Sequence, residues 1–145
     1  RGARRGAAIV QTFQPDHYSI AAAAAQDYKA FYAREIEFRR EAHYPPFASL
    51  ALVEFLGKDE TEVRRSAIWL GKQARGKLGK GLEILGPAPA PMRKVKTRSR
   101  YHMIVRSPRG ASAAAFGRWL LEQAREPLKA RGVEIRLDID PQRFL

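Results

Sequence analysis

The residues best suited to chemistry in this sequence are cations spaced along one short segment. Arginine and lysine bind phosphate oxygens through charge-assisted hydrogen bonds, and a histidine can join them. Such a segment indicates contact with the backbone of a nucleic acid, with little reading of bases because few aromatic residues accompany the charges. The predicted contact residues are Arg93, Lys94, Lys96, Arg98, Arg100, His102 and Arg106.

The charge of the whole chain is concentrated around that segment. The 145 residues include 27 Lys and Arg against 15 Asp and Glu, which gives a net charge of +12. Residues 72–118 hold twelve of these cations and a single acidic residue, Glu83, whereas the rest of the chain is nearly neutral. A charge that served only solubility would be scattered, so the patch indicates a polyanionic partner, with nucleic acid ahead of an anionic membrane.

The residue types in this chain do not favour an enzyme active site. The chain has no cysteine, which excludes disulfides and thiol catalysis. Its histidines lie far apart in the sequence without acidic residues at metal-binding spacing, and no Gly-Lys pair is followed by the Ser or Thr of a phosphate-binding loop. We therefore expect no catalytic residue, no metal site and no cofactor within this chain.

A membrane location is also disfavoured. The longest uncharged stretch, residues 42–53, has twelve residues, fewer than the roughly 18 residues needed to cross a bilayer. The first five residues are not followed by an apolar run of signal-peptide length. We expect a cytoplasmic protein, and because the chain starts with Arg1 we expect it to be a fragment of a longer one.

The hydrophobic pattern predicts the elements that position the cations. Residues 7–13 are typical of a short strand and residues 19–42 of a helix, which the two prolines of Tyr44-Pro45-Pro46-Phe47 bring to an end. The elements expected after that are a strand at 48–56, a helix begun by Asp59, strand pieces at 82–85 and 92–95 around the prolines of 86–91, a strand at 99–106, a helix begun by Ser107 and Pro108, and a strand at 133–139.

This order, β-α-β-β-α-β, predicts an α+β domain of the ferredoxin-like, split β-α-β class. Such a domain has a four-stranded antiparallel sheet with two helices on one face and the other face partly open. Side chains alternate along a strand, so if Tyr101, Met103 and Val105 face the helices, Arg100 and its even-numbered neighbours project from the open face. The alternative is a solvated basic face that binds nothing in particular.

Several stretches, taken in order, resemble the C-terminal part of the primosomal protein N′ family, the PriA-type replication restart DNA helicases. The resemblance rests on residues 1–17, 27–35, 39–47 with the Tyr-Pro-Pro-Phe stop, 86–91, Arg100-Tyr101-His102 and 138–145. It implies that residues 1–18 end the second helicase lobe, that 19–46 form a linking helix and its stop, and that 47–145 form a DNA-binding domain.

The resemblance also implies a function and partners. The parent would be an ATP-dependent 3′–5′ DNA helicase that recognises stalled forks and assembles the primosome, with ATP, Mg and structural Zn bound outside this fragment. Arg109 matches the residue that receives the acidic tail of single-stranded DNA-binding protein, and Arg1 matches the last arginine of a nucleotide-facing helicase motif. Two other functions remain open: an RNA-binding module like a ribosomal protein, and a protein-interaction domain for acidic tails.

Overall fold

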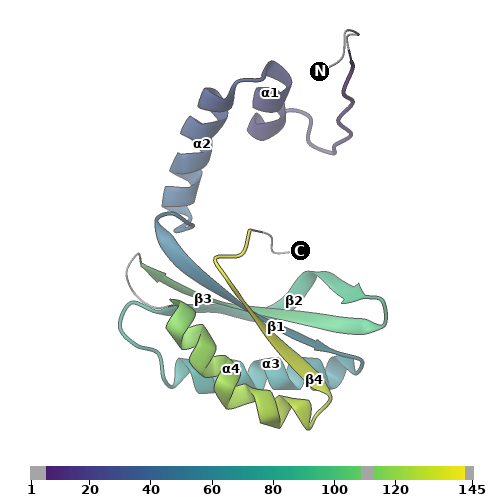
Figure 1. Cartoon of the computed structure of the whole chain (residues 1–145), viewed down its shortest axis with the longest axis vertical. Coiled ribbons are helices and arrows are strands. Elements are labelled where there is room, and N and C mark those ends of the chain that lie inside the picture. The colour runs from purple at the N-terminus through teal and green to yellow at the C-terminus, as the bar shows by residue number, and fades with distance from the viewer. Residues whose placement is uncertain (1–5, 109–112, 143–145) are drawn as a thin grey trace. The chain divides into compact units, whose positions relative to one another are not determined.

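The computed structural model describes residues 6–108 and 113–142 (Figure 1). The chain divides into two compact units, Arg1–Phe38 and Arg39–Leu145. In the part of the chain that the structure describes, no helix has the length and apolar character needed to cross a membrane.

The first unit contains α1, Tyr18–Ala25, and most of α2, Tyr28–Glu41. The single helix expected over 19–42 is therefore wrong: Gln26 adopts a left-handed conformation (φ 55°), and the Asp27 carboxylate accepts a hydrogen bond from the Ala30 N–H at 2.9 Å, which starts a new helix. The strand expected at 7–13 is also absent from the structure. A strand needs a hydrogen-bonded neighbour, and the described residues of the first unit contain no other strand.

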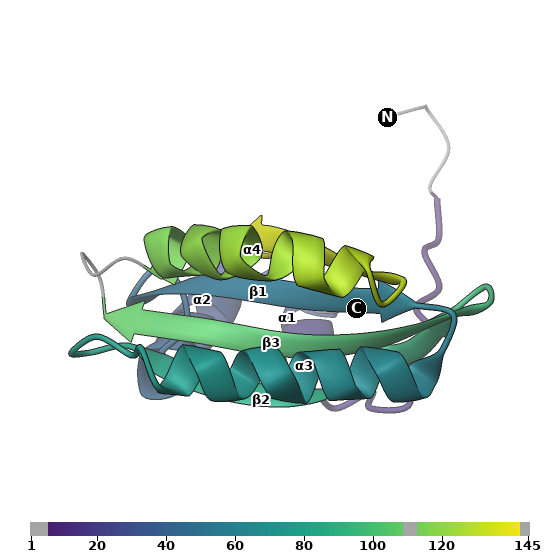
Figure 2. The same cartoon turned by 90° about the horizontal axis from the view of Figure 1, so that it is seen from below.

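The second unit has the predicted β-α-β-β-α-β fold. Its elements are β1 (Ala48–Gly57), α3 (Glu60–Arg75), β2 (Glu83–Val95), β3 (Arg98–Pro108), α4 (Ala113–Lys129) and β4 (Val133–Ile139). The strands form one antiparallel sheet in the order β2-β3-β1-β4. Figure 2 shows α3 and α4 side by side over the same face of that sheet.

The core lies between this face and the two helices. Phe55 of β1 and Met103 of β3 are fully buried there, together with Leu70 of α3 and Leu120 of α4. Tyr101 packs against the same cluster, which confirms the predicted strand phase. The even-numbered residues of β3 therefore belong to the opposite face, which we call the open face.

The first residues of α3 and α4 test the helix starts predicted from the sequence. Asp59 accepts hydrogen bonds from the N–H groups of Thr61 (2.8 Å) and Glu62 (3.2 Å), so the predicted cap of α3 is confirmed. The predicted start of α4 is wrong, because Ser107 and Pro108 complete β3 and the helix begins at Ala113. The Ser107 hydroxyl accepts from the Ala113 N–H at 3.2 Å instead.

The proline-rich segment does not end β2 but disturbs its pairing. The register with β3 shifts between Leu85 and Ala88 and again between Pro89 and Lys94. Prolines lack the N–H that a regular ladder requires, which explains why the interruption predicted from the sequence appears as irregular pairing.

Candidate nucleic-acid interface

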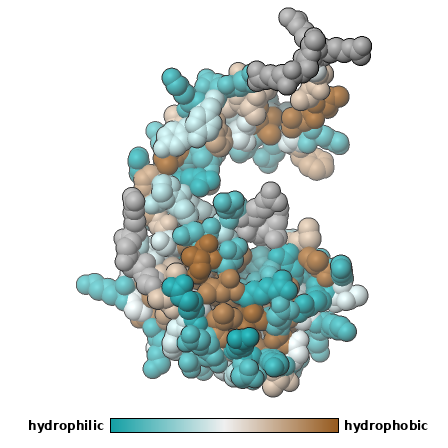
Figure 3. All heavy atoms as spheres, viewed as in Figure 1, coloured by the Kyte–Doolittle hydropathy of each residue, from teal (hydrophilic) through white to brown (hydrophobic). Residues whose placement is uncertain are grey.

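The open face brings most of the predicted contact residues together. Arg98, Arg100, His102 and Arg106 all project from β3 onto this face, and Glu54 of β1 and Glu134 of β4 lie on the same side. The strand alternation that placed the cations here is thus confirmed, but the face also carries carboxylates. Figure 3 shows hydrophilic side chains of this unit interrupted by apolar patches rather than one continuous hydrophilic surface.

Glu54 neutralises the centre of the open face. Arg100 donates to its Oε1 through Nε, at 2.8 Å, and through Nη2, and His102 Nε2 lies 3.1 Å from the same oxygen. The three side chains are only 9–15% exposed. Burial disfavours the ionised form of Glu54, but the hydrogen bonds and charges of Arg100 and His102 outweigh it and hold the pKa of this carboxyl below its ordinary value.

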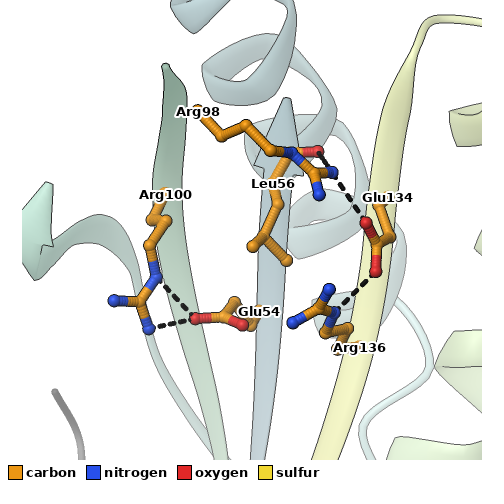
Figure 4. Close-up of polar contacts among 6 residues, drawn as sticks. All are labelled: Glu54, Leu56, Arg98, Arg100, Glu134 and Arg136. Atoms are coloured by element: carbon orange, nitrogen blue, oxygen red, sulfur yellow. Dashed lines mark hydrogen bonds and ion pairs between the residues drawn. The ribbon is translucent and has the colours of Figure 1, made fainter. Parts of the chain in front are cut away.

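Glu134 holds a second pair of cations at the end of the sheet where β3 begins. Arg98 Nη2 donates to Glu134 Oε2 at 2.7 Å, and Arg136 Nε donates to Glu134 Oε1 at 2.6 Å (Figure 4). Arg98 also reaches the Leu56 carbonyl, 3.4 Å away, so its side chain extends across β1. The hydrogen bonds from Arg136 and Arg98 lower the pKa of Glu134.

Arg106 is fixed at the opposite end of β3. Its Nε and Nη2 donate to Glu83 Oε2 at 3.0 and 2.6 Å, and its Nη1 donates to the Ala42 carbonyl at 2.9 Å. The guanidinium therefore ties the start of β2 to the segment that leads into β1. Glu83, the single acidic residue of the basic segment, is bound to one of the predicted contact residues.

The other three predicted contact residues lie at the β2–β3 turn. Lys94 is 3.7 Å from Glu60 of α3, and both side chains are more than half exposed, so this pair is weak. Arg93 ends the irregular part of β2, and Lys96 forms the turn with φ 56°. Neither has an ion pair with any carboxylate of residues 6–108 or 113–142. The structure thus divides the predicted set into exposed turn cations and paired cations on the sheet.

Arg109 and Arg1 lie outside the described residues, so the predictions for the acidic tail and for the nucleotide stay predictions. Within the described ranges no three acidic or histidine side chains gather as metal ligands would.

Sequence reasoning did not assign a role to the carboxylates of the open face. Glu54 is the one charged residue in the otherwise apolar segment 48–56, which is the available signal, but its partners depend on strand register. The strand register places Glu54 between His102 of β3 and Arg136 of β4. Only this register shows that the Glu54 carboxylate balances the positive charge of the predicted interface.

The fold and the basic turn define a small α+β domain built on a split β-α-β sheet whose open face is a network of ion pairs. Comparison with known proteins gives the family. The chain belongs to the family described as the primosomal protein N C-terminal domain, whose model matches residues 40–142.

Relatives along nearly the whole chain carry the name "Replication restart protein PriA". Those of Bacillus subtilis (strain 168) and Synechocystis sp. are 33% and 32% identical, each over 97% of this chain. That of Haemophilus influenzae is 29% identical over 98%. The chain spans only 18%, 16% and 19% of the length of these three relatives.

Proposed function

We propose that this chain is the DNA-binding C-terminal domain of a replication restart protein. Membership of the primosomal protein N C-terminal family carries the proposal, since the relatives that match along the chain are named for replication restart. The concentration of positive charge in residues 72–118 supports it, because a basic patch attracts the phosphates of DNA. In the parent protein the domain would help to recognise stalled forks during primosome assembly.

Arg93, Lys94 and Lys96 are the first candidates for phosphate contacts. These three side chains are exposed at the β2–β3 turn, and the one ion pair that the described residues make with them joins Lys94 to Glu60 at 3.7 Å. Arg98, Arg100, His102 and Arg106 already have carboxylate partners, so a phosphate would have to displace or join those partners. On the sheet, DNA binding therefore competes with internal ion pairs, whereas at the turn the weak Lys94–Glu60 pair is the one competitor among the described residues.

Fluorescence anisotropy with labelled forked DNA at several salt concentrations tests this division. The double variant Arg93→Ala/Lys96→Ala should bind more weakly. The slope of log affinity against log salt concentration should become shallower by about one for each phosphate contact that is lost. The matched control Arg64→Ala/Arg125→Ala removes two exposed arginines from α3 and α4 outside the basic segment and should bind like the original chain. If both double variants bind equally well, the turn is not the DNA site.

The same titration separates DNA binding from the RNA-binding alternative. A domain that serves replication restart should prefer forked DNA to duplex RNA at fixed salt. Tighter binding to the RNA would instead support a module like a ribosomal protein. Failure to bind either nucleic acid would leave the acidic-tail interaction as the remaining function.

Docking of single-stranded DNA-binding protein is the second part of the proposed function. A hollow of about 210 Å³ adjoins the start of the segment that contains Arg109, and it is lined by His43, Phe47, Ala48, Gly81, Glu83, Arg106, Ser107 and Pro108. We assign the terminal carboxylate of an acidic tail peptide to Arg109. Arg109→Ala should weaken that peptide in calorimetry without changing DNA affinity, and an unchanged peptide affinity would remove the assignment.

The enzymatic activity belongs to the longer parent. By its family the parent would be an ATP-dependent DNA helicase, with Arg1 close to the nucleotide and with structural Zn in another part. Unwinding and ATP hydrolysis by the full-length protein would test this, with Arg1→Ala expected to reduce hydrolysis.

A further inference from the structure

A second group of cations lies at the end of β2 opposite to the β2–β3 turn. Lys77 and Lys80 are exposed in residues 76–82, which join α3 to β2 and which we call the glycine-rich loop. Neither lysine has an ion pair with a carboxylate of the described chain. Lys72 and Arg75, in the last turn of α3, complement the negative end of the helix dipole. Lys77 and Lys80 lie beyond that turn, so the dipole does not account for them.

The backbone of the glycine-rich loop also offers donors to an anion. The Leu82 N–H donates to the Gly79 carbonyl at 3.2 Å and closes a turn in which Gly81 has a φ of 81°. The N–H groups of Lys80 and Gly81 donate to no acceptor in the part of the chain that the structure describes. Successive N–H groups of a turn can form a concavity that binds anions, and backbone N–H groups are frequent phosphate contacts. The loop therefore combines two lysine side chains with two available N–H groups.

Arg75 fixes the position of the glycine-rich loop relative to β2. Its Nη1 donates to the Gly71 carbonyl at 3.2 Å, and its Nη2 donates to the Gly86 carbonyl. Gly71 also lies close to Pro87, since a Cβ added at this glycine would be 3.0 Å from the proline Cδ. The end of α3 is thus held against the first part of β2, and the loop that follows the helix starts from a fixed point.

The length of β2 separates the glycine-rich loop from the β2–β3 turn. Glu83 pairs with Arg106 and Val95 with Arg98, so the two ends of β2 are about 27 Å apart at the rise of an extended strand. Residues 84–92 carry no charge, and Arg106 Nη2 lies 2.6 Å from the Glu83 carboxylate. β2 itself therefore contributes no unpaired carboxylate between the two groups of cations.

The outer edge of β2 suits a phosphate backbone better than a protein strand. β2 is an outer strand of the sheet, and its prolines at 87, 89 and 91 lack the N–H groups that a pairing strand needs. β2 also contains no aromatic residue, whereas single-stranded nucleic acids bind by stacking their bases on aromatic side chains. A duplex needs only donors to its phosphates, and these lie at the two ends of β2.

We propose that a DNA duplex lies along the outer edge of β2 and is held at both ends of this strand. At one end its phosphates bind Lys77, Lys80 and the N–H groups of the glycine-rich loop, and at the other they bind Arg93 and Lys96. Each strand of B-DNA carries a phosphate about every 3.4 Å along the axis, so the two contacts are about eight base pairs apart. The contact at the loop rests on the proposed function, DNA binding at the turn, and extends it to a second site and a path.

Fluorescence anisotropy with a duplex of about 16 base pairs, twice the inferred span, tests the second contact. Lys77→Ala/Lys80→Ala should weaken binding about tenfold at physiological salt, and the slope of log affinity against log salt concentration should become shallower by about two. Arg125→Ala/Lys129→Ala is the matched control, because it removes the same charge from exposed positions of α4, which packs on β4 and β1. The control should bind like the original chain, and circular dichroism checks that every variant is folded.

The outcomes separate this second contact from the proposed function. If Lys77→Ala/Lys80→Ala binds like the control while Arg93→Ala/Lys96→Ala binds more weakly, the glycine-rich loop is not a DNA site and binding at the turn stands. If the original chain binds no DNA, both are wrong.

The length of the DNA tests the path along β2. A hairpin with a stem of about six base pairs is too short to reach both ends of β2 at once. On this stem Lys77→Ala/Lys80→Ala should lose only about twofold in affinity, because the original chain gains no second simultaneous contact there. An equal loss on the short stem and on the long duplex would show that the loop and the turn do not bind one duplex together.

An acidic peptide is the competing ligand, because Gly81 of the glycine-rich loop also lines the hollow beside Pro108. Calorimetry with an acidic tail peptide distinguishes the two ligands. Lys77→Ala/Lys80→Ala should weaken the long duplex more than the peptide. A larger loss for the peptide would assign the loop to the tail and overturn the proposal.

Discussion

Replacing Glu54 by glutamine removes the charge that balances the centre of the open face. Its Oε1 accepts two hydrogen bonds from Arg100 and lies within hydrogen-bonding distance of His102, and all three side chains are nearly buried. A hydrogen bond to a charged group contributes about 1.5–3 kcal/mol, and breaking a fully buried pair costs about 3–5 kcal/mol. Glutamine retains an acceptor oxygen, so we expect Glu54→Gln to lower the free energy of unfolding by about 2–3 kcal/mol.

Thermal and urea unfolding followed by circular dichroism measure this loss. For a chain of this size the midpoint temperature should fall by about 10 °C. Glu62→Gln is the matched control: Glu62 makes an exposed pair with Arg65, 3.1 Å away on the surface of α3, and its loss should cost under about 1 kcal/mol. If the two variants lose equal stability, Glu54 does not hold the open face together.

Two further predictions concern the stability of the fold at low pH and a buried hydroxyl group in the core. Ionised Glu54 stabilises the fold because its pKa is lower in the folded chain than in the unfolded chain, so this stabilisation is complete above pH 4.5 and is lost as the pH falls through the folded pKa. The urea midpoint of the original chain should drop in that range more steeply than that of Glu54→Gln, and parallel pH profiles would contradict this. Ser66 of α3 is fully buried and its hydroxyl has no hydrogen-bond partner among the described residues. Ser66→Ala should raise the free energy of unfolding by about 1 kcal/mol in urea titrations, since alanine also favours the helix, and a loss of stability would show that the hydroxyl is satisfied.

Much of the fold follows from signals within a few residues of each other. The Asp59 cap and the alternation over 133–139 predicted their elements because a cap or a strand face is specified locally. Features that depend on more distant partners were missed. Residues 7–13 lack a neighbouring strand, and the start of α4 is displaced because Ser107 continues the ladder with β1.

The candidate interface shows the same limit. Alternation correctly placed Arg100 and Arg106 on the open face. Their carboxylate partners, Glu54 and Glu83, are 46 and 23 residues away in the sequence. Only the register between strands brings these groups together, so spacing along the chain predicts where a cation points but not whether it is already neutralised.

The open face conceals a second apolar layer. Leu50, Leu52 and Leu56 point away from the helices, yet each is at most 7% exposed. The side chain of Arg98 extends across β1 to the Leu56 carbonyl (Figure 4), and the methylene groups of such a side chain can cover apolar neighbours while its charged end stays in water. An arginine in this position shields apolar side chains from water as well as carrying charge. The electrostatics of this surface and the folding of the sheet are therefore set by the same atoms, and neither can be altered alone.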